Sequence, residues 1–173
     1  MKVGRSAEYK VAVGVVEGKI YVIGGSDEDS QLEVFDPETQ TWDFEDEENV
    51  KFESEFSVSM KKKVYRVGRD GRVSTYSPRE GINNDATEML SCKVKFVCVV
   101  GNVLYACFTC CGLMWFNTKL KVWKRVVDRD GKDGKLEMYS SAAKKNGGIR
   151  GKDCLFFGHY LILIARRVNL SVN

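Results

Sequence analysis

The chain has 173 residues, of which 43% are hydrophobic and 29% are charged, a balance typical of a globular protein with a buried core. A formal net charge of +3 is too small to indicate a nucleic-acid-binding protein, and the basic residues are scattered. No apolar signal-peptide segment follows residues 1–5, and the apolar run at 154–165 is too short to span a bilayer. We therefore expect an intracellular protein of the cytoplasm or nucleus.

The first part of the chain contains four short strand signals separated by turns. Strands are expected at residues 10–16, 19–23, 32–35 and from 41 onward. Gly24-Gly25 closes the second run, and Pro37 occupies the favoured second position of a turn after the third. Four short strands within about 40 residues predict one antiparallel blade of a repeat protein.

The same order of signals returns twice further along the chain. In the second cycle we expect strands at 56–59, 63–67 and 72–76, and in the third at 94–100, 103–108, 113–116 and 122–127. Asp70-Gly71 predicts a hairpin turn, because two successive positive φ angles suit an Asp-Gly pair.

Aromatic residues mark the phase of this repeat. The first landmark of each cycle is Phe35, Tyr76 or Phe116, and the second is Trp42, Ile82 or Trp123. Each set recurs about every 40 residues, which is a period typical of propeller repeats. We expect these large side chains to pack between blades rather than to bind a ligand.

These signals predict an all-β fold, a partial β-propeller with about three recognisable four-stranded antiparallel blades and a degenerate fourth. We expect one domain over residues 1–173. Its repeats are predicted at about 5–50, 51–90, 91–130 and 131–173. The last of these keeps only a diglycine and an apolar run, and its best helix candidate, 135–145, has no firm cap.

The cysteines and acidic residues do not predict an active site. The six cysteines are Cys92, Cys98, Cys107, Cys110, Cys111 and Cys154. Cys107 and Cys110 form a CxxC motif, but the sequence shows neither a second ligand pair for zinc nor the βαβ pattern of a redox motif. We expect reduced, structural cysteines, a packed His159 and a solvated acidic loop at 43–48. No catalytic, cofactor-binding or metal-ligating residue is assigned, and the chain is not expected to be an enzyme.

The repeats resemble kelch repeats. Residues 17–25 (EGKIYVIGG) resemble the kelch second strand with its diglycine, and residues 32–42 (LEVFDPETQTW) resemble the half that runs from the aromatic residue through the turn to tryptophan. The third repeat matches at Leu104-Tyr105 and at 116–123. The resemblance covers residues 10 to 127 and is greatest to plant F-box/kelch-repeat proteins.

This resemblance implies a protein-interaction module. In that family the F-box docks on a Skp1-type adaptor of a cullin ubiquitin ligase, and the propeller recruits the protein to be ubiquitinated. No helical F-box is visible ahead of the repeats, so Skp1-type adaptor binding is not expected. The candidate contact loops are 26–31, 68–72 and 109–112.

The expected partner is therefore a protein, including a ubiquitination substrate, and neither nucleic acid nor a membrane. Self-association through open blade edges is a further expectation. Two alternatives stay open: a truncated or degenerate kelch protein without a ligase role, and a kelch protein that acts on small molecules.

Overall fold

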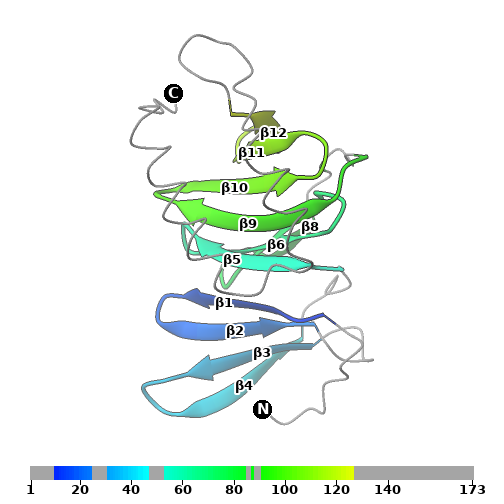
Figure 1. Ribbon diagram of the computed structural model, residues 1–173. Coiled ribbons are helices and arrows are strands. Elements are labelled where there is room, and N and C mark those ends of the chain that lie inside the picture. The colour runs from blue at the N-terminus through cyan, green and yellow to red at the C-terminus, as the bar shows by residue number, and fades with distance from the viewer. Residues whose placement is uncertain (1–9, 25–30, 47–52, 85–86, 88–90, 127–173) are drawn as a thin grey trace, which may run out of the picture.

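The computed structural model describes residues 10–24, 31–46, 53–84, 87 and 91–126. In this part of the chain it contains three four-stranded antiparallel sheets, arranged one after another (Figure 1). The strands are β1 (Ala12–Val16), β2 (Lys19–Ile23), β3 (Gln31–Asp36), β4 (Thr41–Asp46), β5 (Phe56–Met60), β6 (Lys63–Val67), β7 (Val73–Ser77), β8 (Gly81–Asn84), β9 (Val94–Val100), β10 (Val103–Phe108), β11 (Gly112–Asn117) and β12 (Val122–Arg125).

Each sheet is a meander in which every strand pairs with the next strand of the sequence. β1, β5 and β9 are the first strands of their sheets, and β1 packs against β5 and β6 while β5 packs against β9. This arrangement confirms the predicted all-β partial propeller with three blades. The predicted degenerate repeat and the helix candidate at 135–145 lie outside the described residues, and the predicted repeat boundaries stay a prediction.

Two-residue turns with positive φ angles connect β1 to β2 and β5 to β6. Glu17 and Gly18 have φ angles of 50° and 84°, and Lys61 and Lys62 have angles of 51° and 60°. These values match the twist that a two-residue hairpin requires. The prediction of the same turn at Asp70-Gly71 was wrong in detail. Only Gly71 of that pair has a positive φ, because five residues rather than two separate β6 from β7.

The aromatic landmarks occupy the same position in all three sheets. Phe35 lies opposite Trp42, Tyr76 opposite Ile82, and Phe116 opposite Trp123, each across the pair formed by the third and fourth strands. The ring centroids are 4.9 Å apart in the first pair and 5.0 Å apart in the last. Tyr76 and Phe116 are buried, whereas Phe35 and Trp42 are only half-buried. Packing between blades is therefore confirmed for the landmarks of the second and third blades, which belong to the two hydrophobic clusters, whereas Phe35 and Trp42 contact each other within the first blade.

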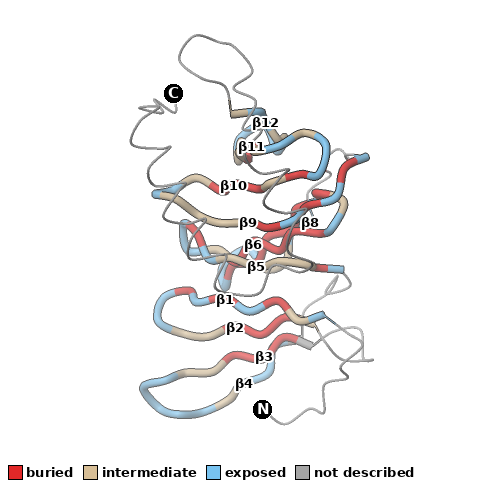
Figure 2. The backbone as a smooth tube through the Cα atoms, in the orientation of Figure 1, coloured by how far each residue is buried: buried red, intermediate tan, exposed pale blue. Residues whose placement is uncertain are grey.

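Buried residues lie in all three sheets (Figure 2), and their hydrophobic side chains form two clusters. One cluster combines residues of the first blade with Val64, Tyr76 and Ile82 of the second. The other combines residues of the second blade, such as Tyr65 and Val73, with residues of the third. Since a four-stranded sheet is a single layer, its faces leave water only where another layer covers them.

The backbone of β1 in the first blade lies very close to the second blade. Gly14 of β1 lies so near β6 that a Cβ atom there would contact both methyl groups of Val64, one at 2.8 Å, and the Ser59 hydroxyl at 2.9 Å. Ser59 accepts a hydrogen bond from the Val15 amide at 2.7 Å. Ser57 bonds both the amide and the carbonyl of Val13, at 3.1 and 3.0 Å. Serine hydroxyls thus satisfy backbone groups at an edge strand, which would otherwise need water or another strand.

The acidic run at 43–48 is placed differently from its prediction. Residues up to Asp46 belong to β4 rather than to a loop, and the rest of the run lies outside the described residues. Glu45 is solvent-exposed, yet its carboxylate accepts a 2.7 Å hydrogen bond from the Tyr76 hydroxyl of the next blade. β4 is the outermost strand of its sheet, and its consecutive residues Asp43, Phe44 and Glu45 are all exposed, so acidic side chains are accommodated in a strand there.

A substitution at Gly14 tests the close approach of the first two blades. We expect Gly14→Ala to lower the free energy of unfolding by about 1–3 kcal/mol, because the new methyl group overlaps Val64. Val13→Thr, on the exposed face of the same strand, should change it by less than about 0.5 kcal/mol. Urea unfolding followed by circular dichroism measures the free energy of unfolding of both variants. Equal stability of the two variants would contradict the close approach of the first two blades at Gly14.

Candidate functional site

The predicted contact loops connect the second strand of each blade to the third. Backbone hydrogen bonds join the loops at 68–72 and 109–112 to the residues just before and at the start of β9, and these two of the three loops fall in the described part of the chain. The third, at 26–31, lies outside it except for Gln31, the first residue of β3. We call residues 68–72, 91–93 and 109–112 the loop end.

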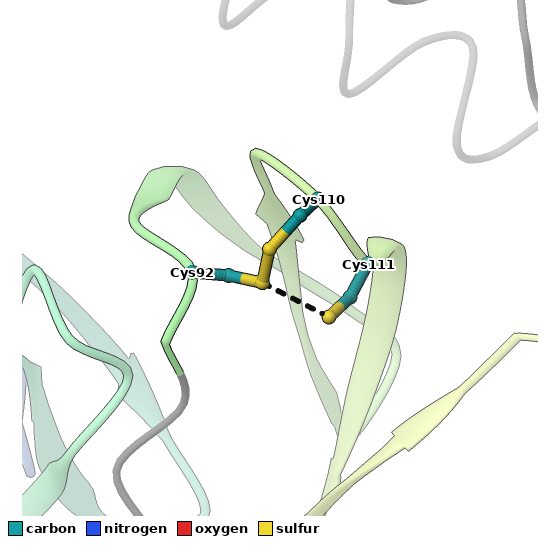
Figure 3. Close-up of side chains that lie close together, drawn as sticks. All are labelled: Cys92, Cys110 and Cys111. Atoms are coloured by element: carbon teal, nitrogen blue, oxygen red, sulfur yellow. Dashed lines mark hydrogen bonds between the residues drawn. A yellow bond between two sulfur atoms is a disulfide. The ribbon is translucent and has the colours of Figure 1, made fainter.

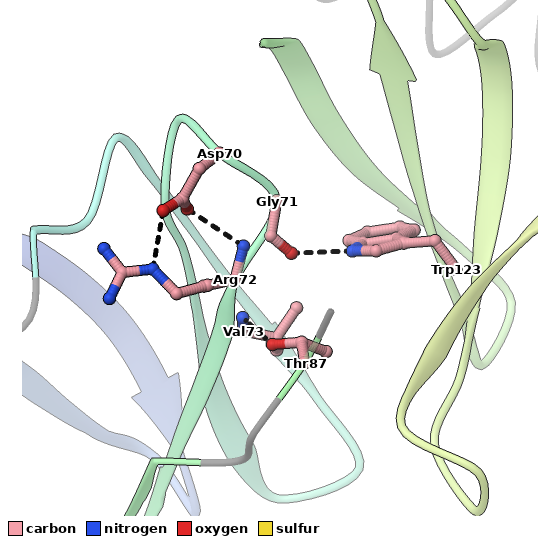
Figure 4. Close-up of polar contacts among 6 residues, drawn as sticks. All are labelled: Asp70, Gly71, Arg72, Val73, Thr87 and Trp123. Carbon is pink, nitrogen blue, oxygen red and sulfur yellow. Dashed lines mark hydrogen bonds and ion pairs between the residues drawn. The ribbon is translucent and has the colours of Figure 1, made fainter. Parts of the chain in front are cut away.

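Internal hydrogen bonds fix the shape of the β6–β7 connection (Figure 4). The Gly68 amide donates to the Arg72 carbonyl at 2.8 Å, and the Gly71 amide donates to the Gly68 carbonyl at 3.0 Å. Asp70 accepts from the Arg72 amide at 3.1 Å and from the Arg72 guanidinium at 2.6 Å. A loop held in this way presents side chains from a fixed backbone and loses little entropy on binding.

The same connection is anchored to the third blade. The Trp123 indole donates a 2.7 Å hydrogen bond to the Gly71 carbonyl, and the Val94 amide donates a 2.8 Å bond to the Arg69 carbonyl (Figure 4 shows the former). Gly71 is buried, and a Cβ there would lie 2.8 Å from a ring carbon of Phe108. Trp123 therefore has a structural role in this seam, as the sequence predicted.

Backbone contacts also join the β10–β11 connection to the segment before β9. The Thr109 amide donates to the Lys93 carbonyl at 2.9 Å, and the Lys93 amide donates to the Thr109 hydroxyl at 3.1 Å. The loop end is therefore continuous from the second blade to the third. The Arg69, Lys93 and Thr109 residues on it are exposed, so a partner can reach polar and cationic groups there.

Three of the six cysteines meet in the loop end, which the sequence analysis did not predict. Cys92 and Cys110 form a disulfide with 5.7 Å between their Cα atoms, and the Cys111 sulfur lies 3.2 Å from that of Cys92 (Figure 3). The expectation that all six cysteines are reduced was therefore wrong for this pair. Cys110 lies 18 positions after Cys92 in the sequence, and the β9–β10 hairpin brings the two residues together.

The CxxC motif does not form a site in this structure. Cys107 lies within β10, where burial raises the pKa of its thiol to about 11, so that the unreactive thiol form prevails at neutral pH. Cys110 lies in the following turn and is bonded to Cys92 instead. Cys98 and Cys111 are half-buried and take part in no disulfide. His159 and Cys154 lie outside the described residues.

Comparison with known proteins settles the family. A family model described as FKB95, Kelch-repeats domain, matches residues 1–160. The chain belongs to the kelch-repeat family. The predicted resemblance to kelch repeats is thereby confirmed.

Several curated proteins of Arabidopsis thaliana are similar to this kelch chain. F-box/kelch-repeat protein At2g44630 is 38% identical over 124 residues, covering 68% of this chain and 33% of its own length. Putative F-box/kelch-repeat protein At2g41360 is 38% identical over 146 residues, covering 76% and 37%. Putative F-box/kelch-repeat protein At5g38680 is 32% identical over 182 residues, covering 88% and 49%. The chain thus spans about a third of the length of the first two relatives.

The comparisons indicate a protein-interaction module, since kelch repeats present their loops as broad binding surfaces. Within the described residues, no helix has the length and apolarity needed to cross a membrane.

A conservative change at Trp123 tests how the loop end is anchored. We expect Trp123→Phe to lower the free energy of unfolding by about 1–3 kcal/mol more than Trp42→Phe, because only the former leaves a buried carbonyl, that of Gly71, without its donor. Trp42 holds the equivalent position in the first blade, so both changes remove the same volume. Denaturant unfolding measures the difference, and equal losses would show that the indole bond adds no stability.

Proposed function

We propose that this chain is part of a substrate-recognition propeller and that its loop end binds a protein partner. The observation that carries the proposal is that hydrogen bonds link residues 68–72, 91–93 and 109–112 into one loop end and anchor its backbone between the second and third blades. Preorganised loops on a rigid scaffold are a common form of binding site.

The exposed charges suggest what the partner presents. Arg69 and Lys93 are both exposed, and the bond between the Arg69 carbonyl and the Val94 amide places their backbones side by side. Asp70, the carboxylate nearest to them in the β6–β7 connection, is already paired with Arg72. An acidic or acceptor-rich segment of a protein would complement this arrangement.

The family supports a more specific role for such a partner. The relatives reported above carry the name F-box/kelch-repeat protein. We propose that the partner is a protein to be ubiquitinated in the cytoplasm or nucleus, and that the chain acts as a receptor rather than an enzyme. An adaptor contact is not assigned to any of its described residues.

Charge reversal at the loop end tests the binding face. The double variant Arg69→Glu, Lys93→Glu should weaken partner binding by about 10-fold or more, since these cations face the partner in the proposal. The matched control is the double variant Lys61→Glu, Lys119→Glu. It reverses the charge of two exposed lysines in turns at those ends of β6 and β11 that are away from the loop end. It should change the affinity by less than about 2-fold.

Binding is measured in two steps. Proteins captured from cell extract by the wild-type chain are first compared with those captured by each variant, and a candidate is then purified and titrated against all three proteins. Loss of binding with the loop-end variant alone supports the proposal. Retention by the loop-end variant, or equal loss with the control, contradicts it.

A further inference from the structure

Cys92, Cys110 and Cys111 bring three sulfur atoms together, all within 4.8 Å of one another (Figure 3). Cys92 precedes β9, whereas Cys110 and Cys111 lie in the β10–β11 turn. Cys92 is 4% exposed, Cys110 is exposed, and Cys111 is half-buried. The cluster is therefore reachable from water on one side and enclosed by the fold on the other.

The backbone holds these residues together independently of the disulfide. Two hydrogen bonds join Lys93, the neighbour of Cys92, to Thr109, the neighbour of Cys110. The β9–β10 ladder continues to the pair Val94 and Phe108, with an irregularity of register just before it. The sulfurs should consequently stay close when the disulfide is reduced.

We propose that, in the reduced protein, Cys92, Cys110 and Cys111 form a thiolate site for a soft d¹⁰ metal ion. Thiolates favour zinc and monovalent copper over hard cations. Two sulfurs bound to one zinc ion at about 2.3 Å lie roughly 3.8 Å apart at the tetrahedral angle, a spacing compatible with this cluster.

The disulfide and the metal-bound form are alternative states of the same cluster. Reduction by two molecules of a thiol such as glutathione breaks the sulfur–sulfur bond between Cys92 and Cys110. It yields two cysteine thiols and one glutathione disulfide. Each of the three thiols then releases its proton as its sulfur binds the metal ion. In the oxidised state two of the three ligands are unavailable, so the site senses the redox state of its surroundings.

The cluster supplies three ligand atoms among the described residues, which leaves an open coordination position for zinc. Exposure of Cys110 puts that position within reach of water or an added ligand. Monovalent copper accepts three thiolates without a fourth ligand. Both ions therefore fit the same three sulfurs, and titration of each ion shows which one binds.

The experiment uses the purified 173-residue chain, without a protein partner, so its result is independent of the proposed function. The disulfide is first reduced with a phosphine under anaerobic conditions. The phosphine oxide that forms and any bound metal are then removed from the protein. Zinc and monovalent copper are then titrated separately in competition with a chromophoric chelator. We expect one equivalent of one of the two ions to bind.

The Cys111→Ser variant should lower that affinity by at least about 100-fold, because even the loss of a group that merely supports a ligand costs 10- to 100-fold. Cys98→Ser is the matched control, since Cys98 is also half-buried and outside any disulfide but does not belong to the cluster. The Cys98→Ser variant should bind the metal ion with the same affinity as the wild type. The oxidised wild type should bind neither ion.

Circular dichroism establishes that each variant is folded, and Cys110→Ser, a change at an exposed position, serves as a second ligand variant. Stoichiometric binding that both cluster variants lose and the control keeps supports the site. Absence of binding to the reduced wild type, or equal binding by Cys111→Ser and Cys98→Ser, overturns it.

Discussion

Each four-stranded sheet of this chain is a single layer, so its apolar side chains leave water only by packing against a neighbouring sheet. Both hydrophobic clusters accordingly combine residues from two blades. Gly14 permits the first of these contacts, and Trp123 joins the second to the β6–β7 connection. The geometry of the loop end follows from this packing, because its backbone hydrogen bonds cross from one blade to the next.

The repeat and its phase could be read from the sequence because they reflect a local constraint. Each landmark pair, such as Phe116 and Trp123, spans a short turn between neighbouring strands, so its spacing is fixed by hairpin geometry. Contacts between blades have no such local signature. Gly14 is an example, because the strand pattern does not indicate that a Cβ atom there would meet Val64 of the next blade. Within the second blade, Arg66 follows the strand pattern yet is 1% exposed and donates a 2.6 Å hydrogen bond to its cross-strand partner Ser74. Burial lowers the pKa of its guanidinium to about 10, which still leaves it cationic at neutral pH.

The candidate site was predictable in part. The strand order placed the loops at 68–72 and 109–112 at equivalent positions, but the sequence did not indicate that Asp70 would pair with Arg72 or that Val94 would bond to Arg69. The sequence did not predict the cysteine cluster, because the CxxC spacing associates Cys110 with Cys107 rather than with Cys92. In a strand, alternate residues point to opposite faces, and the turn carries Cys110 away from Cys107 and toward Cys92. The separation of 18 positions between Cys92 and Cys110 indicates a contact only once the β9–β10 hairpin between them is known.

Adjacent blades share their cores and should therefore unfold together. Native-state amide hydrogen exchange on the 173-residue chain tests it most directly, by comparing the buried strands β2, β6 and β10 under increasing denaturant. A shared core predicts that the slowest amides of all three strands converge on one opening free energy. Slow exchange in β6 and β10 together with unprotected, independently opening amides in β2 would contradict a shared core between the first two blades.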